Sequence, residues 1–137
     1  MLKIEQEQAA GGYTICRPLG ELDAFTVSQF RQALAELASS PRLVIDMSGV
    51  PFVDSAGLGA LIGGIRRARE QGGDVVVACN RPSLVRTLRT TGFDRIVTMT
   101  ETVEEAAAAF DKAVQDQPGP EGPSGATRPG QRNAAAQ

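Results

Sequence analysis

Two short segments with uninterrupted apolar centres constrain the fold of this chain more than any other feature. They are residues 42–47 and 74–79, whose central residues are Leu, Val, Ile or Ala. Such runs are typical of strands buried on both faces, as in parallel sheets that helices cover. The segment between them, residues 55–69, carries apolar residues at helical spacing and is followed by Gly72-Gly73, a typical helix end. We expect a strand, a helix and a second strand, which places the chain in the α/β class.

The flanking segments extend this pattern to a complete domain. Residues 2–7 and 13–17 alternate between apolar and polar on either side of Gly11-Gly12, which predicts a hairpin. After a loop at 18–23, Thr26 is the expected N-cap of a helix that ends near residue 40. Residues 83–91 predict a short helix and 96–99 a final strand. Thr102 then begins the last helix, with Glu105 at the capping-box position. The fold expected is a single α/β domain with a mixed sheet of about five strands and about four helices.

The helical segments each carry a stripe of apolar residues that we expect to face the core. In chain order the four stripes are Val27, Phe30, Leu34 and Leu37; Leu58, Leu61, Ile62 and Ile65; Leu84, Val85 and Leu88; and Val103, Ala106, Phe110 and Val114. The two cysteines, Cys16 and Cys79, are expected as small buried apolar groups in strands.

The composition changes sharply at the end of the chain. Residues 118–137 hold four of the eight prolines and four glycines, and they contain almost no large apolar side chain. A segment of this kind cannot bury enough apolar surface to offset the entropy that folding costs. We therefore expect a domain at 1–117 and a disordered Pro/Gly-rich tail at 118–137.

Composition and charge exclude several classes of function. The chain has no histidine, and its two cysteines are far apart in the sequence, so we expect no metal site and no cofactor. The chain has a net charge of −2, whereas nucleic-acid-binding proteins typically have an excess of basic residues that neutralises the phosphates. The longest apolar run, residues 56–65, is roughly half as long as a membrane-spanning helix, and no leader pattern is present at the N-terminus. We expect a cytoplasmic protein without a membrane span and without direct contact to nucleic acid.

The segment 52–59, Phe-Val-Asp-Ser-Ala-Gly-Leu-Gly, is poorly explained by packing alone. Gly57 and Gly59 fall in the first turns of a helix, where each glycine costs about 1 kcal/mol relative to alanine. One interpretation is that they allow close packing, with Asp54 or Ser55 as the N-cap. The other adds that a helix start flanked by glycine leaves Ser55 exposed to the active site of another protein, as a phosphoacceptor.

Enzymatic interpretations of the same segment are weaker. The spacing Gly57-x-Gly59-x-x-x-Gly63 resembles one form of dinucleotide-binding glycines, but a loop of about eight residues separates it from the preceding strand. A Walker-type phosphate loop is absent from the sequence. Ser55 has neither the preceding glycine of a nucleophile elbow nor an obvious base. We therefore expect that the chain is not an enzyme.

A second cluster of interest precedes the first helix. Asp23 lies there in the segment Gly20-Glu21-Leu22-Asp23, either as a site residue or as a loop carboxylate favoured by the helix dipole. Arg66, Arg67 and Arg69 near the end of the second helix are explained by the same dipole, which favours cations at that end.

Several ordered motifs together resemble the STAS domain family and, more narrowly, bacterial anti-sigma factor antagonists. They are Gly20-Glu21-Leu22-Asp23, the strand Leu43-Val44-Ile45-Asp46 followed by Val53-Asp54-Ser55-Ala56-Gly57-Leu58-Gly59, then Gly72-Gly73 and Gly92-Phe93-Asp94. The resemblance covers about residues 2–116 and leaves the tail outside.

The resemblance implies a switch. In that family an anti-sigma factor that is also an ATP-dependent serine kinase phosphorylates the serine after the aspartate, and a PP2C-type phosphatase removes the phosphate. The unphosphorylated antagonist binds the anti-sigma factor and thereby frees the sigma factor. By motif position the serine is Ser55, and the implied partner-binding residues are Asp23, Asp54, Ser55, Ala56 and Gly57. Many relatives have a second serine where this chain has Ala56.

Two other functions stay open at this point. STAS domains also serve as non-phosphorylated adaptor subunits in stress-signalling or lipid-transport complexes, which is the main alternative. A small nucleotide-binding enzyme is the third possibility.

Overall fold

The computed structural model describes residues 2–116 of the chain and contains one five-stranded sheet. The elements in chain order are β1 (Lys3–Ala9), β2 (Tyr13–Leu19), α1 (Val27–Glu36), β3 (Arg42–Asp46), α2 (Ser55–Glu70), β4 (Asp74–Ala78), α3 (Pro82–Thr90), the 3-10 turn η1 (Phe93–Arg95), β5 (Thr98–Thr100) and α4 (Val103–Asp116). The strand order is β1-β2-β3-β4-β5; β1 is antiparallel to β2, and the other neighbours are parallel. The predicted α/β class, with a mixed sheet of five strands and four α-helices, is confirmed. The predicted tail at 118–137 lies outside the described residues.

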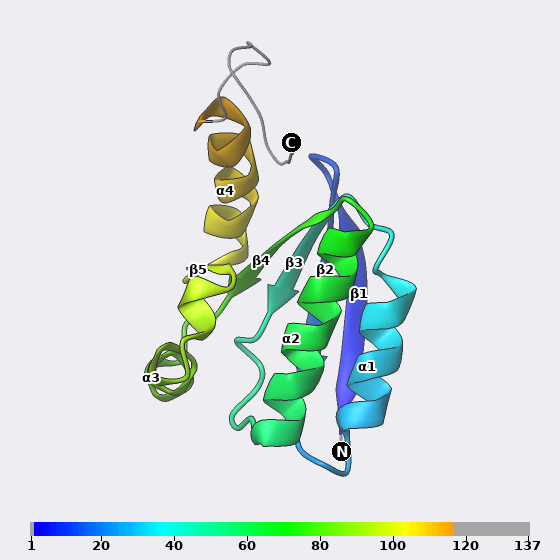
Figure 1. Ribbon diagram of the computed structural model, residues 1–137, viewed down its shortest axis with the longest axis vertical. Helices are drawn as coiled ribbons and strands as arrows, with labels where there is room; N and C mark the ends of the chain where they lie inside the picture. Colours follow the sequence, from blue (N-terminus) through cyan, green and yellow to red (C-terminus); the bar gives the residue numbers. More distant parts are fainter. Residues whose placement is uncertain (1, 117–137) are drawn as a thin grey trace.

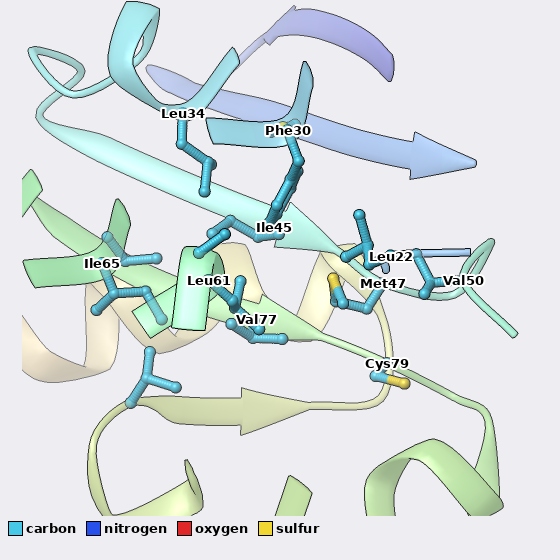
Figure 2. Close-up of a cluster of buried hydrophobic side chains, with 14 of the residues drawn as sticks. Leu22, Phe30, Leu34, Ile45, Met47, Val50, Leu61, Ile65, Val77 and Cys79 are labelled. Carbon is cyan, nitrogen blue, oxygen red and sulfur yellow. The ribbon is translucent and has the colours of Figure 1, made fainter. Parts of the chain in front are cut away.

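The central strands are buried on both faces, as their apolar runs predict. In β3, Leu43 and Ile45 belong to one core and Val44 to the other, because successive side chains point to opposite faces of a sheet. The larger core lies between the sheet and the helices α1, α2 and α3. Figure 2 shows Phe30 and Leu34 of α1 pointing toward Ile45 of β3 in this core. The smaller core lies under α4, which contributes the buried side chains Ala106 and Phe110.

Helices α1 and α2 run side by side across one face of the sheet (Figure 1). Their close approach depends on Gly64, since a Cβ at this position would overlap the side chain of Leu34 in α1. Of the predicted α2 stripe, Leu61 and Ile65 are buried, whereas Leu58 and Ile62 are only partly buried. The buried face of α2 is completed instead by small residues, namely Gly57, Ala60, Gly64 and Ala68.

Among the element boundaries that differ from the prediction, two have a clear local cause. Strand β2 continues through Pro18, which was expected to begin a loop and instead pairs with Ile4 of β1. The register with β3 covers only Thr14–Cys16, and proline is tolerated where one edge of a strand is free. The last strand begins at Thr98 rather than at residue 96, because the N–H groups of Ile96 and Val97 donate to the Phe93 carbonyl and complete a turn.

The remaining local predictions concern a cap, the cysteines and the last helix. The Glu105 N–H donates to Thr102 Oγ1 at 3.0 Å, so the predicted start of α4 is confirmed. Both cysteines are buried and form no disulfide. Cys16 lies on β2, as predicted, but Cys79 follows β4 instead of lying within it. The side chain of Val114 is not among those described. In the described part of the chain, no helix has the length and apolar character to cross a membrane.

Candidate partner-binding site at the start of helix α2

Two loops, one before α1 and one before α2, are joined by backbone hydrogen bonds at the end of the sheet where both helices begin (Figure 1). Leu22 and Val53 form an isolated parallel bridge. The Leu22 N–H donates to the Phe52 carbonyl at 2.9 Å, and the Asp54 N–H donates to the Leu22 carbonyl at 3.0 Å. The side chain of Leu22 is fully buried beneath this pairing. The two motifs that the sequence singles out, around Asp23 and around Ser55, are therefore parts of one structure.

The Asp54 carboxylate holds the two loops together and begins α2. Its Oδ1 accepts a hydrogen bond from the Gly57 N–H at 2.9 Å, which is the usual interaction of an N-cap residue. Its Oδ2 accepts from the Ala24 N–H in the other loop at 3.2 Å. Of the two N-cap candidates, the structure selects Asp54 and leaves Ser55 as the first residue of the helix.

The Asp23 side chain organises the loop before α1. Its Oδ1 accepts from the Phe25 N–H at 2.9 Å and from the Thr26 N–H at 3.1 Å, while the Asp23 N–H donates to Thr26 Oγ1 at 3.1 Å. This reciprocal pair has the form of a capping box, with Asp23 in the capping position. Thr26 is the N-cap of α1 by position, as predicted, but its side chain makes no capping hydrogen bond, because Thr26 Oγ1 instead donates to the Glu21 carbonyl at 2.8 Å. The hydrogen bonds of the Asp23 carboxylate and of the Thr26 hydroxyl together fix the conformation of this loop.

Ser55 is exposed at the first position of α2. Its hydroxyl has no hydrogen-bond partner among residues 2–110, whose side chains the structure describes. The first N–H groups of a helix have no intrahelical acceptors, and here Asp54 takes only the one of Gly57. The neighbouring Ala56 is half-buried and adds no second hydroxyl. This corner of the molecule thus presents one bare hydroxyl beside free helix N–H groups.

The two glycines near Ser55 have different surroundings. Gly57 is buried, and a Cβ there would lie 2.6 Å from the Leu22 carbonyl oxygen and 2.9 Å from its Cβ. A Cβ at Gly59 would meet no atom within 4 Å. The close-packing interpretation therefore applies to Gly57, with the paired loop as its neighbour, and does not explain Gly59.

The surface around Ser55 combines carboxylates with exposed aromatic rings. Glu21 is exposed, and Asp23 and Asp54 are half-buried, so three acidic groups lie on the joined loops. Phe25 is 94% exposed and Phe52 is 52% exposed. These two phenylalanines were not among the site residues predicted from the sequence, although an aromatic residue inside each acidic motif was a visible signal.

Elsewhere among the described residues, the features are of a different kind. A cavity of about 440 Å³ lies where β4 and β5 end, lined by residues that include Cys79, Arg89 and Glu101. Burial raises the pKa of the Cys79 thiol, and it raises the pKa of Cys16 to about 12, so both thiols stay neutral and weakly nucleophilic at neutral pH. Among the described side chains of residues 2–110, no group of three or more His, Cys, Asp or Glu could hold a metal ion.

Comparisons with known proteins assign the family. The STAS domain model matches residues 3–106. The anti-sigma F factor antagonist of Paenibacillus polymyxa is 30% identical over 99 residues, which are 70% of this chain and 84% of that protein. The anti-sigma-B factor antagonist of Listeria monocytogenes is 30% identical over 80 residues, 57% of this chain and 70% of that protein. A crystal structure of an anti-sigma factor antagonist from Mycobacterium paratuberculosis has a TM-score of 0.74 at 27% identity, covering 81% of this chain and 95% of that one. The resemblance seen in the sequence is confirmed, and the chain belongs to the STAS domain family.

Proposed function

We propose that this chain is an anti-sigma factor antagonist that binds a kinase-type anti-sigma factor and is switched off by phosphorylation of Ser55. In its unphosphorylated form it frees the sigma factor in the cytoplasm, and a PP2C-type phosphatase restores that form. The chain is then the substrate of the kinase and not itself an enzyme. The relatives named as anti-sigma factor antagonists support the general role.

The observation that carries the proposal is the exposed Ser55 hydroxyl, which is unpartnered among the described residues and lies at a helix start fixed by Asp54. In the reaction, Ser55 Oγ attacks the γ-phosphorus of ATP and forms a new O–P bond. The bond between that phosphorus and the bridging oxygen breaks, ADP leaves, and the hydroxyl proton passes to a base of the kinase. The antagonist has only to hold the hydroxyl in reach, and the joined loops provide this rigidity.

The domain itself tolerates the phosphate. A phosphoserine carries about −1.5 to −2 charges at neutral pH and three acceptor oxygens. The first turn of a helix offers free N–H groups and the positive end of the dipole, and both favour an anion. We therefore expect phosphorylation to leave the fold of residues 2–116 unchanged.

The phosphate on Ser55 instead weakens the complex with the partner. A partner surface that closes on a bare hydroxyl must accommodate added bulk and desolvate the phosphate beside Asp23 and Asp54. Binding excludes water from between these groups and so strengthens their repulsion: two unit charges about 6 Å apart interact by about 0.7 kcal/mol in bulk water but by about 3 kcal/mol in an effective dielectric of about 20. A loss of about 3 kcal/mol weakens binding by roughly a hundredfold, which is enough for a switch.

The test is phosphorylation and binding by a purified kinase-type anti-sigma factor from the same organism. With ATP, we expect mass spectrometry to place one phosphate on Ser55 of the wild type. The S55A variant should bind with wild-type affinity and take up no phosphate, whereas S55D should bind at least tenfold more weakly and keep the wild-type melting temperature. The S83A variant is the matched control, because Ser83 is also exposed in the first turn of a helix.

Three results contradict the proposal. Phosphate on another residue, or unchanged affinity of the phosphorylated wild type, would exclude Ser55 as the switch. Tight binding without any phosphate transfer would favour the alternative function, a STAS adaptor subunit that is not phosphorylated.

A further inference from the structure

Phe25 is the most exposed large apolar side chain among the described residues, at 94%. Single exposed apolar residues are common on protein surfaces. The unusual feature here is that the backbone on both sides of Phe25 is fixed. The Phe25 and Thr26 N–H groups donate to Asp23 Oδ1 at 2.9 and 3.1 Å, and the Ala24 N–H donates to Asp54 Oδ2 at 3.2 Å. A loop held in this way presents the ring to solvent in a defined place.

The loop that carries Phe25 is joined to the helix start that carries Ser55, because the Asp54 carboxylate binds both. One oxygen of this carboxylate caps the helix that Ser55 begins, and the other binds the N–H of Ala24, the residue before Phe25. Phe52, which is 52% exposed, lies on the segment paired with Leu22. We therefore expect a protein whose catalytic cleft receives the Ser55 hydroxyl to contact the Phe25 loop as well.

We propose that Phe25 is an apolar anchor for the kinase-type anti-sigma factor, inserted into an apolar pocket that lies beside the partner's phosphoryl-transfer site and is rimmed by Lys or Arg side chains. This inference rests on the proposed function. The apolar pocket follows from the ring, because buried aromatic side chains dominate the binding energy of many interfaces. The basic rim follows from charge complementarity to Glu21, Asp23 and Asp54.

A second copy of the chain fits this surface poorly. Self-association through the same patch would bring the carboxylates of Glu21, Asp23 and Asp54 toward their counterparts, and like charges brought together in an interface cost affinity. The acidic surroundings of Phe25 thus favour a partner of opposite local charge.

The experiment compares dissociation constants for the purified anti-sigma factor with a non-hydrolysable ATP analogue, so that binding is measured without phosphoryl transfer. We expect F25S to weaken binding about 30-fold, as removal of an aromatic hot spot does, and F25Y to stay within threefold of the wild type. I96S is the matched control, because Ile96 is also exposed but contacts Arg69 at the other end of α2. It should bind like the wild type, and F25S and F25Y should keep the wild-type melting temperature.

Phosphorylation by the same kinase with ATP separates this inference from the proposed function. If the wild type is phosphorylated on Ser55 and F25S shows both unchanged affinity and unchanged kcat/KM, the anchor is wrong and the switch stands. If the wild type binds without phosphorylation and F25S binds about 30-fold more weakly, the anchor stands and the switch is wrong. A dimer of the wild type alone that F25S abolishes would overturn the anchor, since a second copy would then be the occupant.

Discussion

Gly57 and Gly59 lie two residues apart at the start of α2, yet the space around them differs. The Cβ position of Gly57 is occupied by the Leu22 backbone, whose carbonyl oxygen also accepts the hydrogen bond from Asp54. The Cβ position of Gly59 is open. Gly57 is thus required by the pairing of the two loops, and Gly59 adds exposed helix backbone near Ser55.

This contrast predicts opposite effects of two alanine substitutions. Gly57→Ala should lower the free energy of unfolding by about 1–3 kcal/mol, because the backbone of Leu22 must move to admit the methyl group. Gly59→Ala should raise it by about 0.4–1 kcal/mol, because alanine reduces the entropy of the unfolded chain and fits the open position. Urea unfolding of both variants measures the difference. Equal effects of the two substitutions would contradict the close contact at Leu22.

At the scale of elements, α1 and α2 share a starting structure. Asp23 and Asp54 each accept hydrogen bonds from N–H groups at a helix start, and Asp54 also reaches the loop of the other helix. Because the paired backbone between Leu22 and Val53 lies between these caps, loosening one helix start loosens the loop before the other. The proposed partner surface is therefore only as rigid as these two carboxylates make it.

Asp54→Ala tests this connection. It removes the acceptors of the Gly57 and Ala24 N–H groups, and the loss of a helix cap typically costs about 1–2 kcal/mol. We expect unfolding in urea at lower concentration and faster amide hydrogen exchange in the loop at 22–26. Asp94→Ala is the control, since Asp94 is exposed within the 3-10 turn η1 and its side chain caps no helix there. It should stay within about 0.5 kcal/mol of the wild type. Unchanged exchange at 22–26 in Asp54→Ala would show that Asp54 does not join the loops.

Most elements could be predicted from periodicity, and the failures have local causes. Strands β3 and β4 are buried on both faces, and their centres are therefore apolar. Their composition alone makes them recognisable as strands in the sequence. Ile96 and Val97 have the same strand-forming character, but their N–H groups complete a turn at Phe93. A pattern of apolar residues does not show which backbone hydrogen bonds are made. Pro18 was misread for a similar reason, because its place in β2 depends on which edge of that strand is free.

The site was predictable in its chemistry but not in its connections. The Asp-Ser-Ala-Gly segment indicated both an N-cap and an exposed hydroxyl, and Asp54 and Ser55 have these properties. The pairing of Leu22 with Val53 joins residues about thirty positions apart, and nothing in the local pattern of either segment specifies it. The sequence shows an aromatic residue at position 25, but it does not show that this side chain is exposed.

At the scale of the whole molecule, the two faces of the sheet are covered unequally. Three helices pack on the larger core, but α4 is the helix that packs on the smaller one. Its Phe110 and Ala106 lie against Ile15, Val44 and Val76, which are nearly inaccessible to solvent. The last helix before the Pro/Gly-rich segment thus completes the fold.

This arrangement predicts a sharp difference between two truncations. A chain ending at residue 117 should melt cooperatively at the temperature of the full chain and bind its partner equally well, because the segment 118–137 lacks the apolar side chains that a core needs. A chain ending at residue 101 loses α4 and exposes Ile15, Val44 and Val76, each of which contributes about 1.5–3 kcal/mol when fully buried. Since domains of this size are stable by only about 5–15 kcal/mol, the shorter chain should not unfold cooperatively. Circular dichroism during heating distinguishes the two.

Early melting of the 1–117 chain would place part of the tail in the domain, and a cooperative transition of the 1–101 chain would mean that the larger core is stable without α4.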